Sequence, residues 1–173
     1  MMITFQITRE DLLAHLAAYN AQLGTIKNVY RRGFLWGPLL GLLAVAVFRP
    51  AADGVALGLV AICTVVGAAV WHLTWPSRLA RANRALLDEG VMAKEIGTHT
   101  ITVEPDGIHE VAEWGEVLRK WHVVTDVEEA PTHVFVYCAG QGPCIVVPRT
   151  AFASPSEQDE FVKAVRARGP ISG

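Results

Sequence analysis

Residues 54–77 read GVALGLVAICTVVGAAVWHLTWPS, a run of twenty-four residues without a formal charge. An α-helix rises about 1.5 Å per residue, so this run spans roughly 36 Å, more than the ~30 Å hydrocarbon core of a bilayer. A helix in the core of a soluble domain normally keeps one polar stripe, which this run lacks. The run therefore predicts a transmembrane helix.

A second apolar run, residues 33–48 (GFLWGPLLGLLAVAVF), comes just before it and is bounded by arginines at both ends. Its sixteen residues span roughly 24 Å as a helix, which is less than the thickness of the bilayer core. The helix becomes long enough if it begins at Val29 and Tyr30, in which case the side chains of Arg31 and Arg32 extend to the lipid headgroups. Residues 49–53 (RPAAD) have the composition of a turn. The two runs predict a two-helix transmembrane hairpin over residues 33–77.

Basic and aromatic residues at the ends of the hairpin predict its orientation. The basic residues before the first run and after the second are Lys27, Arg31, Arg32, Arg78, Arg81 and Arg84. Only Arg49 lies in the connecting turn, so the positive-inside rule predicts a multi-pass protein of the cytoplasmic membrane with both termini in the cytoplasm. Trp36, Trp71 and Trp75 fit an aromatic belt on that same side.

Two pairs of glycines at a spacing of four mark candidate packing faces of the predicted spans. Gly37 and Gly41 lie in the first run, and Gly54 and Gly58 in the second. Small residues at this spacing allow close helix approach. Packing within the hairpin and packing of a homodimer are both open.

The segments that flank the hairpin also carry secondary-structure signals. Residues 3–7 (ITFQI) alternate apolar and polar side chains as a strand does, and Thr8 then caps a helix that either follows the membrane surface or enters the first span. Since the hairpin returns the chain to its starting side, we predict that residues 2–7 add an edge strand to the C-terminal sheet. Residues 78–91 continue the second span as a helical stalk.

The C-terminal half changes to the period of a β-sheet. Strands are predicted at residues 99–103, 107–112, within 116–127, 133–138 and 144–147. A final helix has Ser154 as its N-cap, Pro155 at its first position and Glu157 completing a capping box. The fold class is therefore α+β. The predicted order is an N-terminal strand and amphipathic helix (1–32), the hairpin (33–77), the stalk (78–94) and a β-rich domain (95–173).

Composition and charge exclude some classes of protein. The chain has 173 residues, of which 51% are hydrophobic and 18% charged, too apolar for a disordered regulator. Its net charge of −2 argues against a nucleic-acid-binding protein with a globally basic face. Residues 1–85 carry eight basic and three acidic residues, whereas residues 86–173 carry seven and fourteen.

A search for reactive groups finds no motif of an enzyme, and no catalytic residue, metal site or cofactor is predicted. His99 and His109 are expected on one face of the first hairpin, without a further metal ligand. His72 is either a proton-relay group or a neutral histidine at the membrane interface.

The acidic and sulfur-containing residues of the chain are given structural roles. The glutamates Glu110, Glu113, Glu116, Glu128 and Glu129 are interpreted as a solvated rim of the β-rich domain. Cys138 and Cys144 face each other across a turn and are expected to stay reduced in the cytoplasm, and Cys63 lies inside the second span.

Several short motifs resemble one family. They are the Thr8–Asp11 helix start, a tryptophan in the middle of the β-rich domain, and the run IVVPRTAFAS at residues 145–154 before the last helix. Together with the two spans, they resemble the bacterial YcxB-like membrane proteins. The resemblance implies a pleckstrin-homology-like sheet with a capping helix on the cytoplasmic side of the bacterial inner membrane, and it implies no catalytic residues.

The sequence thus predicts a membrane-anchored interaction or regulatory module without catalytic activity. Its expected partners are the lipid bilayer and a protein or lipid that contacts the cytoplasmic domain, and no nucleic acid is expected. The alternative is an immunity-type membrane protein that neutralises a membrane-acting toxin, in which the hairpin itself carries the activity. An unrelated hairpin could replace the spans in the first case but not in the second.

Overall fold

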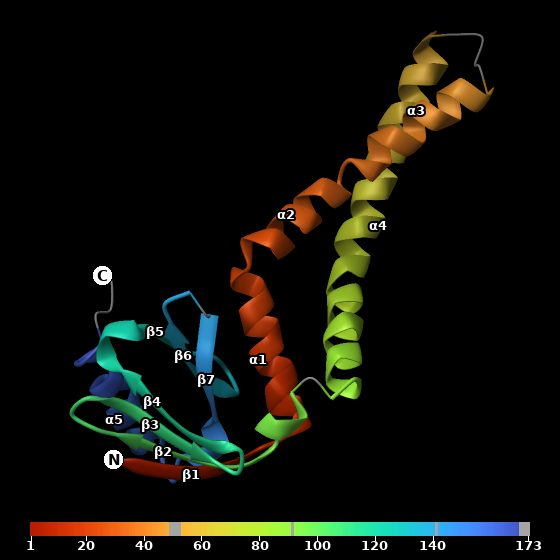
Figure 1. Cartoon of the computed structure of the whole chain (residues 1–173). Coiled ribbons are helices and arrows are strands. Elements are labelled where there is room, and N and C mark those ends of the chain that lie inside the picture. The colour runs from red at the N-terminus through yellow and green to blue at the C-terminus, as the bar shows by residue number, and fades with distance from the viewer. Residues whose placement is uncertain (49–52, 91, 141, 170–173) are drawn as a thin grey trace. The chain divides into compact units, whose positions relative to one another are not determined.

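A computed structural model describes residues 1–48, 53–90, 92–140 and 142–169, and it has the predicted α+β composition (Figure 1). The chain divides into two compact units, which we call the β-rich unit (Met1–Asn20 with Asn83–Gly173) and the helical unit (Ala21–Ala82). The described strands are β1 (Met2–Ile7), β2 (Gly97–Val103), β3 (Gly107–Ala112), β4 (Gly115–Lys120), β5 (Val124–Glu129), β6 (His133–Cys138) and β7 (Gly142–Pro148). The described α-helices are α1 (Arg9–Gln22), α2 (Gly24–Gly33), α3 (Trp36–Phe48), α4 (Asp53–Asp88) and α5 (Pro155–Arg166).

The strands of the β-rich unit form two antiparallel sheets. The first has the order β1-β2-β3-β4 and the second β5-β6-β7 (Figure 1). The two predicted hairpins are confirmed as β2–β3 and β6–β7. The predicted pairing of the N-terminal segment is also confirmed, because β1 lies at the edge of the first sheet with Ile3 opposite Ile101 and Ile7 opposite Gly97.

Both sheets and α5 contribute to one hydrophobic core. The inward side chains of β1, which are Ile3, Phe5 and Ile7, are all buried there, and Phe161 of α5 is completely buried. The predicted cap of α5 is confirmed: the Glu157 amide donates to Ser154 Oγ at 3.2 Å. The Glu157 carboxylate in turn accepts from the Ala153 amide at 2.6 Å, which fixes the chain as it enters the helix.

The single strand predicted within residues 116–127 is two strands in different sheets. They are separated by the short helical turn η2 (Trp121–Val123). The Trp121 indole donates to the carbonyl oxygens of Glu104 at 3.1 Å and Pro105 at 2.9 Å, and the Trp121 amide donates to Asp106 O at 3.3 Å. These bonds hold the chain at the β2–β3 turn, where it leaves the first sheet and enters the second.

Helix α1 belongs to the β-rich unit up to Asn20, and it ends at Gln22 without continuing into the first apolar run. Leu12 is buried in the core, and the Asn20 side chain donates to Asn83 Oδ1 at 2.8 Å. His133 Nε2 lies 2.9 Å from Asp11 Oδ1 and ties the start of the helix to β6. Burial would raise the pKa of Asp11, but hydrogen bonds from Thr8 and His133 outweigh it and lower the pKa.

Helix α4 is the one described helix that is long and apolar enough to cross a membrane, whereas the sequence predicted two. Its thirty-six residues run without interruption through Pro76. Between residues 55 and 73, seven large apolar side chains are 50–76% exposed: Val55, Leu57, Ile62, Val65, Val66, Val70 and Leu73. Helix α3 has thirteen residues, or about 20 Å, and is short of bilayer thickness by itself. The predicted turn at residues 49–52 lies outside the described residues.

Candidate functional site

The β-rich unit contains a cavity of about 220 Å³. Its polar lining consists of His15, Glu95, His99, Glu110, Trp114 and Arg119, and its apolar lining includes Ile7, Leu12, Met92 and Val146. These residues come from helix α1, from β1–β4, from β7 and from the segments between them, so the cavity exists only when the whole unit is folded. It opens to the surface, and five ionisable side chains of this unit line it.

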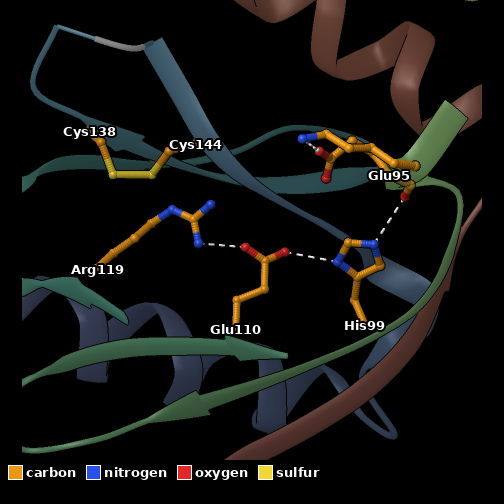
Figure 2. Close-up of polar contacts among 7 residues, drawn as sticks. Glu95, His99, Glu110, Arg119, Cys138 and Cys144 are labelled. Carbon is orange, nitrogen blue, oxygen red and sulfur yellow. Dashed lines mark hydrogen bonds and ion pairs between the residues drawn. A yellow bond between two sulfur atoms is a disulfide. The ribbon is translucent and has the colours of Figure 1, made fainter. Parts of the chain in front are cut away.

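Three charged side chains form a row along the wall of the cavity (Figure 2). Glu110 lies in the middle, with its Oε1 at 2.8 Å from His99 Nδ1 and its Oε2 at 2.5 Å from Arg119 Nη1. The three residues share one face of the sheet because side chains alternate along β2, β3 and β4. His99 Nε2 lies 3.0 Å from the carbonyl oxygen of Glu95. Both ring nitrogens of His99 therefore face acceptors, an arrangement that suits an imidazolium with two N–H donors.

The pKa shifts of the row agree with this geometry. Burial alone would lower the pKa of His99, but its hydrogen bonds to Glu110 and to the Glu95 carbonyl outweigh burial and raise the pKa. Burial would raise the pKa of Glu110, whereas the His99 hydrogen bond and the Arg119 charge lower it. Burial lowers the pKa of His15, which also lines the cavity, and favours its neutral form. The charged groups of the cavity are thus the row formed by His99, Glu110 and Arg119, together with the neighbouring Glu95.

Trp114 contributes a donor that has no acceptor. Its Nε1–H is buried and makes no hydrogen bond with any described residue. The ammonium of Lys94 lies 5.3 Å from the centre of the Trp114 ring. Buried polar groups in proteins nearly always have a partner, so an unsatisfied donor in the residue that lines a cavity points to a missing acceptor.

The structure corrects two expectations about the polar residues of this domain. His99 and His109 lie on opposite faces, because His99 is opposite Ala112 while His109 is opposite Thr102. Glu110 is 7% exposed and is not part of a solvated rim. A strand alternates its faces, so a carboxylate two positions from an inward Ile108 had to point inward as well. To place these residues on a face, one must know which residues of β2 and β3 pair. This pairing depends on where the turn closes, which the sequence does not give.

The remaining glutamates of the predicted rim are dispersed. Glu116 Oε2 lies 3.3 Å from His109 Nε2. Glu128 accepts from the Tyr137 hydroxyl at 2.6 Å, and Glu129 accepts from the Gln158 amide at 3.0 Å. Among the residues that the structure describes, no group of three His, Cys, Asp or Glu is placed to hold a metal ion.

Cys138 and Cys144 face each other as predicted, but they form a disulfide and are not the free thiols expected of a cytoplasmic domain (Figure 2). They lie at the ends of neighbouring strands β6 and β7, where the pairing of Cys138 with Gly142 brings the two side chains together. The expectation of free thiols rested on the compartment, whereas the bond follows from this proximity. Cys144 also lines the cavity.

Reduction of this disulfide is expected to lower the unfolding free energy by about 2 kcal/mol, because the two cysteines are only 6 positions apart in the sequence and the closed loop is short. Chemical denaturation of the purified chain with and without dithiothreitol measures the difference. The variant Cys138→Ser/Cys144→Ser should match the reduced protein and respond no further to the reductant. A reductant effect that persists in this variant would contradict the prediction.

The residues predicted for the membrane interface lie at the ends of the apolar helices. Lys27, Arg31 and Arg32 of α2, Trp36 of α3, and Arg78, Arg81 and Arg84 of α4 are exposed, whereas Trp71 and Trp75 are half-buried. Trp71 Nε1 donates to Tyr30 O at 2.9 Å, and Arg78 lies over the Trp71 ring at 5.4 Å. His72 Nδ1 lies 2.6 Å from the Tyr30 hydroxyl, so this histidine has a partner within the helical unit.

The four predicted packing glycines lie in different surroundings. A Cβ at Gly41 would come within 2.7 Å of Val60 Cα, so α3 and α4 approach each other closely there. Gly54 and Gly58 of α4 have open space around them, and Gly37 lies in α3. The sequence did not single out Gly33, where a Cβ would overlap the Trp71 ring.

Sequence reasoning missed Trp114, Arg119 and His15 as cavity residues. The inward position of Arg119 follows from its place opposite Ile108, but only after the β3–β4 register is known. Trp114 lies in the two-residue turn between β3 and β4, which by itself gives no signal for burial.

Comparison with known proteins agrees with the resemblance drawn from the short motifs. Residues 103–165 match a family model described as YcxB-like protein. No curated protein and no solved structure matches the chain. The matched segment runs from the end of β2 into α5 and includes Glu110, Trp114 and Arg119. Over residues 103–165, the chain is therefore similar to the YcxB-like family.

Proposed function

We propose that the protein is a membrane-anchored interaction or regulatory module that presents its β-rich unit at the cytoplasmic surface of the bacterial inner membrane. The observation that carries this proposal is the pairing of β1 with β2. Both strands belong to one sheet, so residues 2–7 and 97–103 lie on the same side of any membrane that the chain crosses. The chain must then cross an even number of times between them.

Two crossings satisfy this requirement. Helix α4 supplies one, and the apolar residues 33–48 supply the other if the segment before α3 joins it. The helical turn at Phe34 and Leu35 supports such a continuation, since their amides donate to the carbonyl oxygens of Arg31 and Arg32. The close approach at Gly41 supports packing of the two spans as a hairpin.

The basic residues at the ends of α2 and α4 favour the cytoplasmic side for the β-rich unit. Disulfides are rare in that compartment. On this orientation, the Cys138–Cys144 disulfide is one of these rare cases. The two sheets followed by a single helix, α5, support the finer proposal of a pleckstrin-homology-like domain.

Cysteine labelling in intact cells tests the orientation. In a chain with Cys63, Cys138 and Cys144 replaced by alanine, Asp159→Cys should resist a membrane-impermeant maleimide, whereas Ala52→Cys should react with it. Asp159 is exposed on α5, so its cysteine should react fully once the cells are permeabilised, which serves as the control. Labelling of Asp159→Cys in intact cells would place the β-rich unit outside and contradict the proposal.

An intramembrane role is the second candidate, and the open space around Gly54 and Gly58 favours it because a partner helix could approach α4 there. An immunity-type protein would act in this way. Replacement of residues 33–77 by an unrelated two-span hairpin of equal length and orientation separates the two candidates. We expect the chimera to retain the partners that co-purify with the native chain in mild detergent. Loss of these partners at equal expression would favour the intramembrane role.

A further inference from the structure

We propose that the cavity of the β-rich unit binds a small carboxylate with a short apolar body, whose carboxylate oxygens accept hydrogen bonds from Trp114 and Arg119. This inference goes beyond the proposed function, because it requires neither a membrane nor a protein partner. It rests on the polar groups, the charge and the size of the cavity.

Arg119 and Trp114 both carry N–H donors that make no hydrogen bond with a described residue. Each oxygen of Glu110 already has one hydrogen-bond partner, His99 for Oε1 and Arg119 for Oε2. A guanidinium carries five N–H donors, and among the described residues Arg119 directs one of its hydrogen bonds to Glu110. The Trp114 Nε1–H is buried and has no acceptor among them. A ligand that fits this wall must supply acceptor oxygens.

The charge of the wall favours an anionic acceptor over a neutral one. Arg119 and an imidazolium at His99 flank the single carboxylate of Glu110, so this row carries one positive charge in excess. The raised pKa of His99 supports that protonation state. Glu95 also lines the cavity and has its own counter-ion outside the lining, because its Oε1 lies 3.9 Å from Lys94 Nζ. Hydrogen bonds to an ionised acceptor are about twice as strong as neutral ones.

The remaining lining and the volume limit the body of the ligand. Ile7, Leu12, Met92 and Val146 provide apolar surface next to the charged row. A volume of about 220 Å³ corresponds to about seven water molecules in the liquid. Hexanoate and benzoate, with eight and nine non-hydrogen atoms, are carboxylates of this size and serve as the probes.

Isothermal titration calorimetry on the full chain in nanodiscs tests the site, with empty nanodiscs as the blank. Hexanoate or benzoate should bind with one-to-one stoichiometry, and hexylamine should bind at least tenfold more weakly. Trp114→Phe removes the unsatisfied N–H and keeps an aromatic ring, so it should weaken carboxylate binding about tenfold. It should not lower the melting temperature of the ligand-free protein, because it removes a donor that has no partner.

Trp121→Phe is the matched control, since the Trp121 indole donates to the Glu104 and Pro105 carbonyls and does not line the cavity. Its carboxylate affinity should stay within twofold of the native value. The proposal is overturned if neither probe binds at concentrations up to about 10 mM. Native carboxylate affinity in Trp114→Phe, or stronger binding of hexylamine, would overturn it as well.

Discussion

Deletion of strand β1 is expected to abolish cooperative unfolding of the β-rich unit. Ile3, Phe5 and Ile7 are 3–9% exposed, and each contributes about 2 kcal/mol through burial. Their combined contribution is comparable to the whole stability of a typical domain, about 5–15 kcal/mol. The deletion also leaves the edge of β2 without a partner.

A soluble form of the unit makes this measurement direct. Residues 1–20 can be joined to residues 83–173 by a short flexible linker, because the side chains of Asn20 and Asn83 are hydrogen-bonded at 2.8 Å. We expect a sigmoidal thermal transition by circular dichroism for this fusion and none for the same fusion without residues 1–8. Thr4→Ser, on the outward face of β1, should leave the transition nearly unchanged. Equal melting temperatures with and without β1 would show that the strand is dispensable.

The substitution Glu110→Gln is expected to lower the unfolding free energy by about 3 kcal/mol. It leaves the positive charges of His99 and Arg119 without their shared buried anion, and loss of one partner of a buried ion pair is costly. Chemical denaturation of the full chain or of the soluble fusion measures the loss. Glu116→Gln makes the same chemical change at a carboxylate whose side chain is 71% exposed, and it should cost less than about 0.5 kcal/mol.

The pH dependence of this loss follows from the pKa shifts. The raised pKa of His99 contributes stability below pH 6.5, and this contribution is lost as the pH rises through the folded-state pKa. The lowered pKa of Glu110 contributes stability above pH 4.5, which is lost as the pH falls through its folded-state pKa. The difference between the native chain and Glu110→Gln should therefore be largest between pH 4.5 and 6.5. A difference independent of pH would contradict the ionic origin of the loss.

Much of the fold could be predicted from local signals. The turn at Pro105 and Asp106, the cap at Ser154 and the alternation in residues 3–7 each specify their element within a few residues. The pairing of β1 followed from a topological argument, since an apolar hairpin returns the chain to the side where it began. Long-range hydrogen bonds, such as those of Trp121 that divide residues 116–127 between two sheets, have no such local signal.

The cavity could not be predicted because it depends on register and on packing between distant segments. In the sequence, Glu110 is one glutamate among several in a polar stretch. Its pairing with Ile101 places its side chain on the inward face of the sheet, the face on which His99 also lies. The unsatisfied donor of Trp114 is a property of the folded surroundings and cannot be read from residue order. Likewise, the disulfide follows from the closure of the β6–β7 hairpin, whereas the sequence argument started from the compartment.

The pairing of β1 with β2 also sets an order of events during synthesis. Ile7 leaves the ribosome about 90 residues before its partner Gly97, which corresponds to between about 4 and 18 seconds of translation. On the proposed topology, the apolar segments enter the bilayer during that interval, before the partner strand of β1 has been synthesised. A chain whose spans insert with the wrong number of crossings leaves β1 and β2 on opposite sides, so its core cannot close. On the proposed topology, closure of the sheet therefore requires an even number of crossings, and only chains inserted in this way complete the core.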